Sequence, residues 1–187
     1  MTWVGRPLEL VRALDSVYLD QARANLPAYV ATTLRYSQLV GGRYNPPGEF
    51  GALYTSDDEA TAWEEIAAHF RREGIRELPH DMGLLGIVVP VGRYADLTDP
   101  TTQAAWEIDA GALAAESPTE SERNACWAVA RSIRVVADFL QAPSARGDGM
   151  NVPLFPDRDQ SELRLELQFT RRSLVPEHLR QHPRESW

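Results

Sequence analysis

The chain has 187 residues, of which 43% are apolar and 25% charged; this is the composition of an ordinary globular domain. Its length is enough for one domain with a hydrophobic core, so we treat residues 1–187 as a single domain. No apolar run approaches the roughly 20 residues of a membrane span, and the amino terminus lacks the pattern of a secretion signal. The formal charge of −8 argues against nucleic acid bound through a basic face.

The basic residues other than histidine are all arginine, 19 in number. A catalytic lysine is therefore excluded, and any bound anion must be held by arginine, backbone N–H groups or helix ends. Cys126 is the single cysteine, so no internal disulfide can form, which fits a reducing cytoplasm. The four histidines lack the spacing of zinc ligands, and we expect no metal and no resident cofactor.

The first half of the chain contains helix, loop and strand signals in turn. Apolar residues between Leu8 and Tyr18 are spaced for one buried face and predict a helix. Residues 40–48 are rich in turn formers and predict a loop, and residues 52–55 then predict a short strand. Ser56 and Glu59 have the spacing of a capping box, which predicts a helix from Ser56 to about Phe70.

The second half alternates between the two kinds of element. The continuous apolar run at residues 84–89 predicts a strand buried on both faces. Residues 121–133 predict a helix, and residues 135–142 a further strand. Apolar and polar residues alternate over residues 163–169, which predicts a half-buried strand near a sheet edge. Strands and helices are interspersed without regular βαβ order, so we predict an α+β fold with a mixed sheet and flanking helices.

Three stretches contain residues suited to chemistry, and the first is the loop that begins at Gly41. Two glycines allow a backbone to approach a ligand closely, and Arg43 offers a planar fork for a diphosphate. Tyr44 can stack on a ring, and Asn45 follows it. The alternative is a surface turn with a solvated arginine, which composition alone favours.

The second stretch is the strand that contains Tyr54 and the helix that follows it. Glu65 lies on a different strip of this helix from Trp63, which should face the core. A glutamate beside a strand that carries Tyr54 can line a cleft. The alternative is an exposed Glu65–His69 pair at i,i+4 spacing, and the pattern by itself does not separate Glu65 from Glu64.

The third stretch begins at Ser144, whose hydroxyl would lie at the end of a strand, where ligand sites often occur. Asn151, shortly afterwards, can bind a sugar or an amide, although serine and asparagine are also common in ordinary turns. No G-x-S-x-G elbow surrounds Ser144, which argues against a hydrolytic triad. Neither a G-x-G-x-x-G motif nor a P-loop is present, so redox use of a dinucleotide is not indicated.

Taken in order, the three stretches resemble the RES domain family, whose pattern is roughly G-G-R-W-N-P-P-G, a-L-Y, A-L-x-E-x-x-x-H and V-P-S-A followed by N and P. The matching segments here are 41–48, 52–54, 62–69, 142–145 and 151–153. The resemblance spans about residues 35–156 and leaves a polar tail at about 176–187. Tyr44 replaces the usual tryptophan, and Trp63 replaces a leucine.

The resemblance implies a fold similar to that of ADP-ribosyltransferase toxins and a cytoplasmic enzyme that cleaves the nicotinamide–ribose bond of NAD+. The acceptor would be water or phosphate or, as the alternative, a protein. It also implies an Xre-like antitoxin that covers the site, and a homodimer or antitoxin-bound assembly. A catalytically silent domain that only binds a partner is the third possibility.

The resemblance also assigns roles to residues. It places Glu65, rather than Glu64, in the E-x-x-x-H register as the carboxylate that stabilises charge on the ribose. A further arginine nearer the amino terminus is expected, for which Arg35 and Arg12 both remain candidates. The implied catalytic residues are Glu65, Arg43 and Tyr54, and the implied substrate-binding residues are Tyr44, Asn45, Ser144, Asn151 and Arg35.

Overall fold

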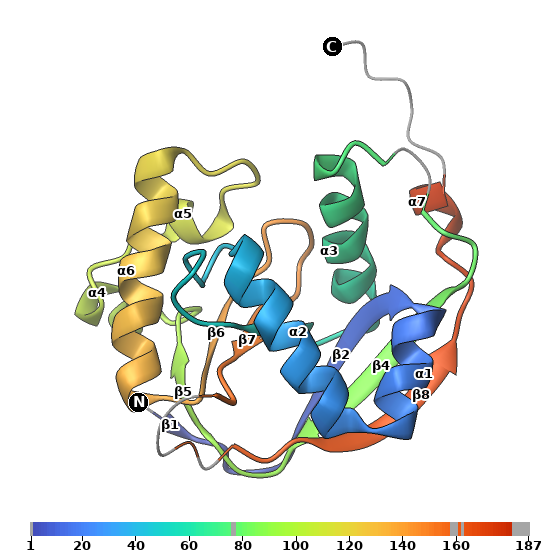
Figure 1. Ribbon diagram of the computed structural model, residues 1–187. Helices are drawn as coiled ribbons and strands as arrows, with labels where there is room; N and C mark the ends of the chain where they lie inside the picture. Colours follow the sequence, from blue (N-terminus) through green and yellow to red (C-terminus); the bar gives the residue numbers. More distant parts are fainter. Residues whose placement is uncertain (1, 76–77, 158–160, 162, 181–187) are drawn as a thin grey trace.

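The computed structural model describes residues 2–75, 78–157, 161 and 163–180 (Figure 1). The strands are β1 (Thr2–Trp3), β2 (Leu8–Asp15), β3 (Leu53–Ser56), β4 (Met82–Val89), β5 (Arg93–Asp96), β6 (Phe139–Pro143), β7 (Met150–Leu154) and β8 (Glu166–Arg172). The helices are α1 (Ser16–Ala24), α2 (Leu26–Val40), α3 (Glu59–Arg72), α4 (Pro100–Ala105), α5 (Ala110–Ala114), α6 (Glu120–Val136) and α7 (Glu177–Arg180). None of these helices has the length and apolar character needed to cross a lipid bilayer.

The strands form one sheet in the order β1-β5-β6-β7-β3-β2-β4-β8. Neighbouring strands are antiparallel except for β5 and β6, which run parallel. A parallel pair requires a crossover connection, and here α4, α5 and α6 supply it between β5 and β6. The sheet is therefore mixed and flanked by helices, which confirms the predicted α+β fold.

Helices cover both faces of the sheet. On β3, Leu53 packs into the core beneath α1 and α2, whereas the next residue, Tyr54, packs against the core beneath α5 and α6. Val11 belongs to a third core, beneath α3, and pairs with Ser56 across β2 and β3. Because Ser56 and Tyr54 point to the same side of β3, α3 shares a sheet face with α5 and α6. Figure 1 shows the β6–β7 connection rising between them.

The predicted first helix is wrong, because residues 8–15 form β2. This strand lies inside the sheet between β3 and β4 and is buried on both faces. Leu10 and Leu14 enter the core beneath α1 and α2, whereas Val11 and Ala13 enter the core beneath α3. Apolar residues at positions 10, 11 and 14 therefore satisfy a central strand as well as a helix. The pattern in the sequence does not distinguish the two.

The later elements are of the predicted type, but several of them begin or end at other residues than predicted. Helix α3 begins after Asp58, whose carboxylate accepts a bond from the Thr61 N–H, so the cap predicted at Ser56 is wrong. Helix α6 continues to Val136, and the strand expected from residue 135 therefore begins at Phe139. Strand β4 is buried along almost its whole length, and β8 lies at the sheet edge, both as predicted. The expected half burial of this edge strand is wrong, because β8 spans Glu166–Arg172 and is mostly exposed.

The predicted polar tail divides into two parts. Residues 177–180 form α7, and Leu179 on this helix is buried in the core beneath α3. Residues 181–187 lie outside the described residues.

Candidate active site

The glycine-rich loop after α2 has a backbone that requires glycine at two positions. Gly41 ends the helix with φ of +71°, in the left-handed region that favours glycine. A Cβ atom on Gly42 would lie 2.5 Å from the hydroxyl oxygen of Tyr54. The indole N–H of Trp127 on α6 donates to the Gly42 carbonyl over 2.8 Å. The loop is thus fixed between β3 and α6.

Tyr54 holds this loop in shape through its hydroxyl group. That hydroxyl donates to Asn45 Oδ1 over 2.8 Å and accepts from the Tyr44 N–H over 2.9 Å. The Asn45 amide group donates in turn to the carbonyls of Ser37 and Phe50. Burial raises the pKa of the Tyr54 phenol far above its usual range, so the group stays neutral and can donate.

Tyr44 and Asn45 have no exposed surface. The ring of Tyr44 packs in the core beneath α5 and α6, and the side chain of Asn45 is bonded at both ends inside the loop. The resemblance implied that these residues bind the substrate, and that role stays a prediction. In the structure both side chains are buried, and that of Asn45 holds the loop in shape from within.

Arg43 points from the loop toward the end of α5. Its two terminal nitrogens donate to the main-chain carbonyls of Leu113 and Ala115. The predicted diphosphate fork is therefore bonded to the last turn of α5 and to the residue that follows this helix. The charge of Arg43 still acts on its surroundings, because it lowers the pKa of Tyr54 and that of the Cys126 thiol against the effect of burial.

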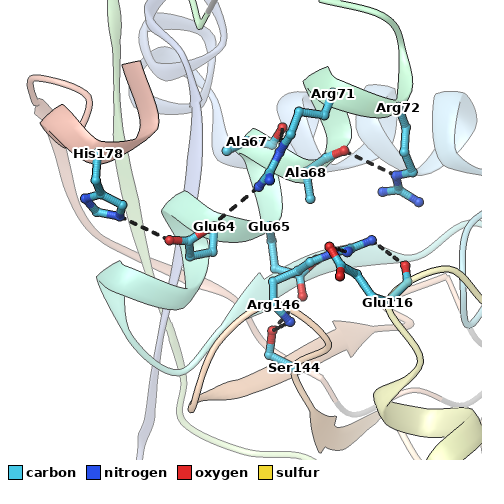
Figure 2. Close-up of polar contacts among 10 residues, drawn as sticks. All are labelled: Glu64, Glu65, Ala67, Ala68, Arg71, Arg72, Glu116, Ser144, Arg146 and His178. Carbon is cyan, nitrogen blue, oxygen red and sulfur yellow. Dashed lines mark hydrogen bonds and ion pairs between the residues drawn. The ribbon is translucent and has the colours of Figure 1, made fainter. Parts of the chain in front are cut away.

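The two adjacent glutamates of α3 point in different directions (Figure 2). Glu65 accepts a hydrogen bond from the hydroxyl of Ser144 over 2.8 Å. Glu64 lies 3.1 Å from His178 Nε2 on α7 and 3.8 Å from Arg71. Glu65 thus faces the β6–β7 connection, and Glu64 faces α7.

Ser144 connects Glu65 to an arginine that the sequence patterns do not single out. The Ser144 hydroxyl also accepts a hydrogen bond from the main-chain N–H of Arg146 over 3.0 Å. The Arg146 side chain is only 9% exposed and forms an ion pair with Glu116, and it donates to the main-chain carbonyl of the same residue. Within a run of Ser, Ala, Gly and Asp residues, Arg146 has the pattern of a solvated turn residue. Its burial depends on segments distant in the chain, which no local pattern reveals.

Of the two candidate amino-terminal arginines, the structure places Arg12 beside Tyr54. Its Nη1 donates to the Tyr54 carbonyl over 2.6 Å, and its Nε is buried with no partner among the described residues. Burial, Arg72 and Arg12 together lower the pKa of His69 on α3. Arg35 is exposed on α2, and its side chain makes no hydrogen bond or ion pair with the part of the chain that the structure describes.

Asn151 lies on β7, paired with Ser56 on β3 and with Ala142 on β6. Its side chain thus lies on the sheet face that α3 shares with α5 and α6. The side-chain amide oxygen of Asn151 is buried and accepts no hydrogen bond from any described residue. A buried amide oxygen without a partner is costly, and it is available to a ligand that brings a donor.

Several charged side chains of this region act on the pKa values of the same groups. Glu65 and Arg43 both act on the pKa of Tyr54, in opposite directions. The same two groups act on Arg146, where burial is the main cause of a lowered pKa and Glu65 opposes it. The carboxylate of α3 and the guanidinium of the loop are thus both within electrostatic reach of Tyr54 and Arg146. The motifs that carry Glu65 and Arg43 therefore meet in one region of the fold.

Two hollows in the surface lie away from these residues. One, of about 110 Å³, is lined by residues 78, 80, 174, 175 and 180. The other, of about 390 Å³, lies between α2 and the segments around Pro156 and Leu165. Neither is lined by Glu65, Ser144 or Arg146. Glu65 contacts Ser144, and its charge acts on Arg146, which lies close by (Figure 2).

Comparison with known families agrees with the motif order. The family model of the RES domain matches residues 20–177. The chain belongs to the RES domain family. This match includes the glycine-rich loop, Glu65 and Ser144, and it extends beyond the segment of about 35–156 over which the motifs are recognised.

Two known proteins are similar to this chain. The first is a Mycobacterium tuberculosis protein described as a probable NAD(+) phosphorylase, 28% identical over 127 residues, or 66% of this chain. The match spans 60% of that relative's length. The second is a chain in the crystal structure of the M. tuberculosis MbcT–MbcA toxin–antitoxin complex, with a TM-score of 0.68 and 19% identity, covering 92% of this chain and 87% of that one. The second likeness shows a shared fold.

Proposed function

We propose that this RES-family protein cleaves the bond between nicotinamide and ribose in NAD+, with phosphate or water as the acceptor. The observation that carries the proposal is the Glu65 carboxylate, which Ser144 fixes by a hydrogen bond and whose charge reaches the Arg146 guanidinium. The relative described as a probable NAD(+) phosphorylase supports the substrate. In the cytoplasm such a reaction would deplete NAD+ and act as a toxin.

The reaction makes a specific demand on the protein. When the C1′–N1 bond breaks, its electron pair leaves with nicotinamide, which is then neutral and needs little acid assistance. The ribose ring is left with developing positive charge, which a nearby carboxylate stabilises. Water or phosphate then forms the new bond to C1′ through oxygen and loses a proton. The products are nicotinamide and either ADP-ribose or its 1″-phosphate.

Each residue of the site has a task in this proposal. Glu65 stabilises the developing charge on the ribose, and Ser144 holds its carboxylate in one orientation by donating to Oε1. The free carbonyl oxygen of Asn151 accepts from the nicotinamide amide or a sugar hydroxyl. Tyr54 fixes the loop that presents Arg43, whose positive charge favours a diphosphate nearby.

The test is product analysis by mass spectrometry after the purified protein is mixed with NAD+, with and without inorganic phosphate. We expect free nicotinamide in both mixtures. ADP-ribose should accompany it without phosphate, and the 1″-phosphate should appear when phosphate is added. NAD+ that stays intact in both mixtures would disprove the proposal.

Transfer of ADP-ribose to a protein is the alternative, and the same assay separates the two. Glycohydrolase or phosphorylase action needs no protein acceptor and gives small-molecule products from NAD+ alone. A protein ADP-ribosyltransferase would leave NAD+ largely unchanged until a target protein is added. A domain that only binds a partner would leave NAD+ unchanged with or without that target.

The proposal includes an Xre-like antitoxin that covers the site. A chain of the same fold was solved in a toxin–antitoxin complex. In this chain the last turns of α2, just before the glycine-rich loop, expose Tyr36, Leu39 and Val40, at 60%, 70% and 55%. Apolar side chains grouped at a site suit a protein partner. We expect Leu39→Glu to stay toxic on expression but to escape neutralisation by the antitoxin; full neutralisation would exclude this surface.

A further inference from the structure

We propose that Arg146 binds a phosphate group of the substrates, and that Glu116 occupies the same guanidinium until the phosphate arrives. The inference rests on the proposed NAD+ cleavage and assigns a further substrate-binding residue to it. The observation that suggests it is an uneven ion pair: the Arg146 side chain is 9% exposed, and its partner Glu116 is 69% exposed.

The position of Arg146 links it to the reacting end of the site. Its main-chain N–H donates to the Ser144 hydroxyl, which in turn donates to Glu65 (Figure 2). The charge of Glu65 also acts on the Arg146 guanidinium, so a phosphate bound there is near the carboxylate assigned to the ribose. Arg43 does not offer the same opportunity, because both of its terminal nitrogens are bonded to the carbonyls of Leu113 and Ala115.

The surrounding charges favour an anion at this position. Burial lowers the pKa of Arg146, and the charges of Arg72, Arg43 and Arg71 lower it further, with Glu65 as the main opposing charge. A guanidinium in such surroundings gains from a second negative group. Glu116 supplies that group in the structure, and the oxygens of a phosphate can accept paired bonds from arginine as those of a carboxylate do.

The exposure of Glu116 makes the exchange feasible. Its carboxylate lies at the solvent side of the pair, so it can turn into water while Arg146 keeps its place beside Ser144. An exposed carboxylate gains little from a surface ion pair compared with its hydration. The exchange therefore costs little, whereas the phosphate gains a partly buried cation.

Two sources of phosphate are compatible with this site, the diphosphate of NAD+ and the inorganic phosphate acceptor. Steady-state kinetics separates them. The KM for NAD+ is measured in phosphate-free buffer, where water is the acceptor, and the KM for phosphate is measured at saturating NAD+. The variants are Arg146→Gln, Arg146→Lys and Glu116→Gln, with Arg172→Gln as control because Arg172 on β8 forms an exposed ion pair with Asp20 on α1.

We expect Arg146→Gln to raise one of the two KM values by about 10- to 100-fold, as loss of a hydrogen bond to a charged group does. Arg146→Lys should give a smaller rise, and Arg172→Gln none. Glu116→Gln should lower the same KM, because it removes the competing carboxylate. A purely structural ion pair would make the Arg146 and Glu116 variants change in the same direction, and that result, or unchanged KM values, would overturn the inference.

Failure of the proposed function gives a different result. If the unaltered protein does not consume NAD+, calorimetric titration of NAD+ and of inorganic phosphate tests the site without catalysis. Binding that is weakened in Arg146→Gln and strengthened in Glu116→Gln would support the phosphate site even then. Equal binding by all variants, or binding to none, would reject it.

Discussion

The hydroxyl of Ser144 donates to Glu65 Oε1 over 2.8 Å, and this bond joins two residues that are 79 positions apart. It connects α3 to the β6–β7 connection across one face of the sheet. Because the hydroxyl also accepts from the Arg146 N–H, its proton is directed to the carboxylate. Glu65 is thus presented as an oriented acceptor, the state in which a carboxylate can stabilise positive charge on a sugar.

Glu65→Gln should abolish NAD+ cleavage while the protein stays folded. Loss of one electrostatic contact in such a site costs about 10²- to 10³-fold in rate. The glutamine has the same shape and can still accept from Ser144, so thermal unfolding should change little. The rate of nicotinamide release measures the effect.

Glu64→Gln is the matched control for this variant. It changes the neighbouring residue of the same helix, which contacts His178 and Arg71 instead of Ser144. We expect nicotinamide release at close to the unaltered rate. Equal loss of activity in both variants would show that the charge of α3, and not the position of Glu65, matters.

Tyr54→Phe should destabilise the glycine-rich loop. The change removes the donor to Asn45 Oδ1 and the acceptor of the Tyr44 N–H, and Asn45 has no exposed surface where water could replace the lost bond. A buried polar group without its partner costs about 1–3 kcal/mol. Urea unfolding should show this loss in the free energy of unfolding. A stability equal to that of the unaltered protein would mean that the loop rearranges freely around the substituted ring.

Gly42→Ala should be destabilising for a different reason. The added Cβ would lie 2.5 Å from the Tyr54 hydroxyl and 2.8 Å from Asn45 Oδ1, and overpacking of this kind costs about 1–3 kcal/mol. Gly5→Ala is the control, because no atom lies within 4 Å of the added Cβ. The midpoint of thermal unfolding should fall for Gly42→Ala and not for Gly5→Ala. A similar fall in both would reject the steric explanation.

The site follows from the sequence more closely than the beginning of the fold does. The motif register favours Glu65 over Glu64, and in the structure it is Glu65 that is bonded to Ser144, a residue of another motif. The periodicity around Leu10 predicts a helix, because a strand buried on both faces carries apolar residues at helical spacing as well. Ser144 stands out in the sequence because it follows a predicted strand.

Some features of the site cannot be predicted from local patterns. Arg146 forms its ion pair with Glu116, thirty positions earlier in the chain, and this contact leaves no sign in the local sequence. Tyr44 is predicted to stack on a ligand, since an aromatic residue in a glycine-rich loop has no local sign of burial. The choice between Arg12 and Arg35 likewise depends on the pairing of β2 with β3, which is a long-range contact.

The pKa of His69 makes stability depend on pH. Burial lowers this pKa from 6.5, and Arg72 and Arg12 lower it further. Between the lowered folded value and 6.5, the unfolded chain binds more protons than the folded protein, so the free energy of unfolding falls as pH falls through this window. Above pH 6.5 both states carry a neutral imidazole and the effect vanishes.

His69→Gln should therefore flatten the pH dependence of stability just below pH 6.5, measured by urea unfolding at a series of pH values. His80→Gln, a change at an exposed position, should leave the pH dependence as it is; if His80→Gln flattens it equally, the effect does not come from the burial of His69.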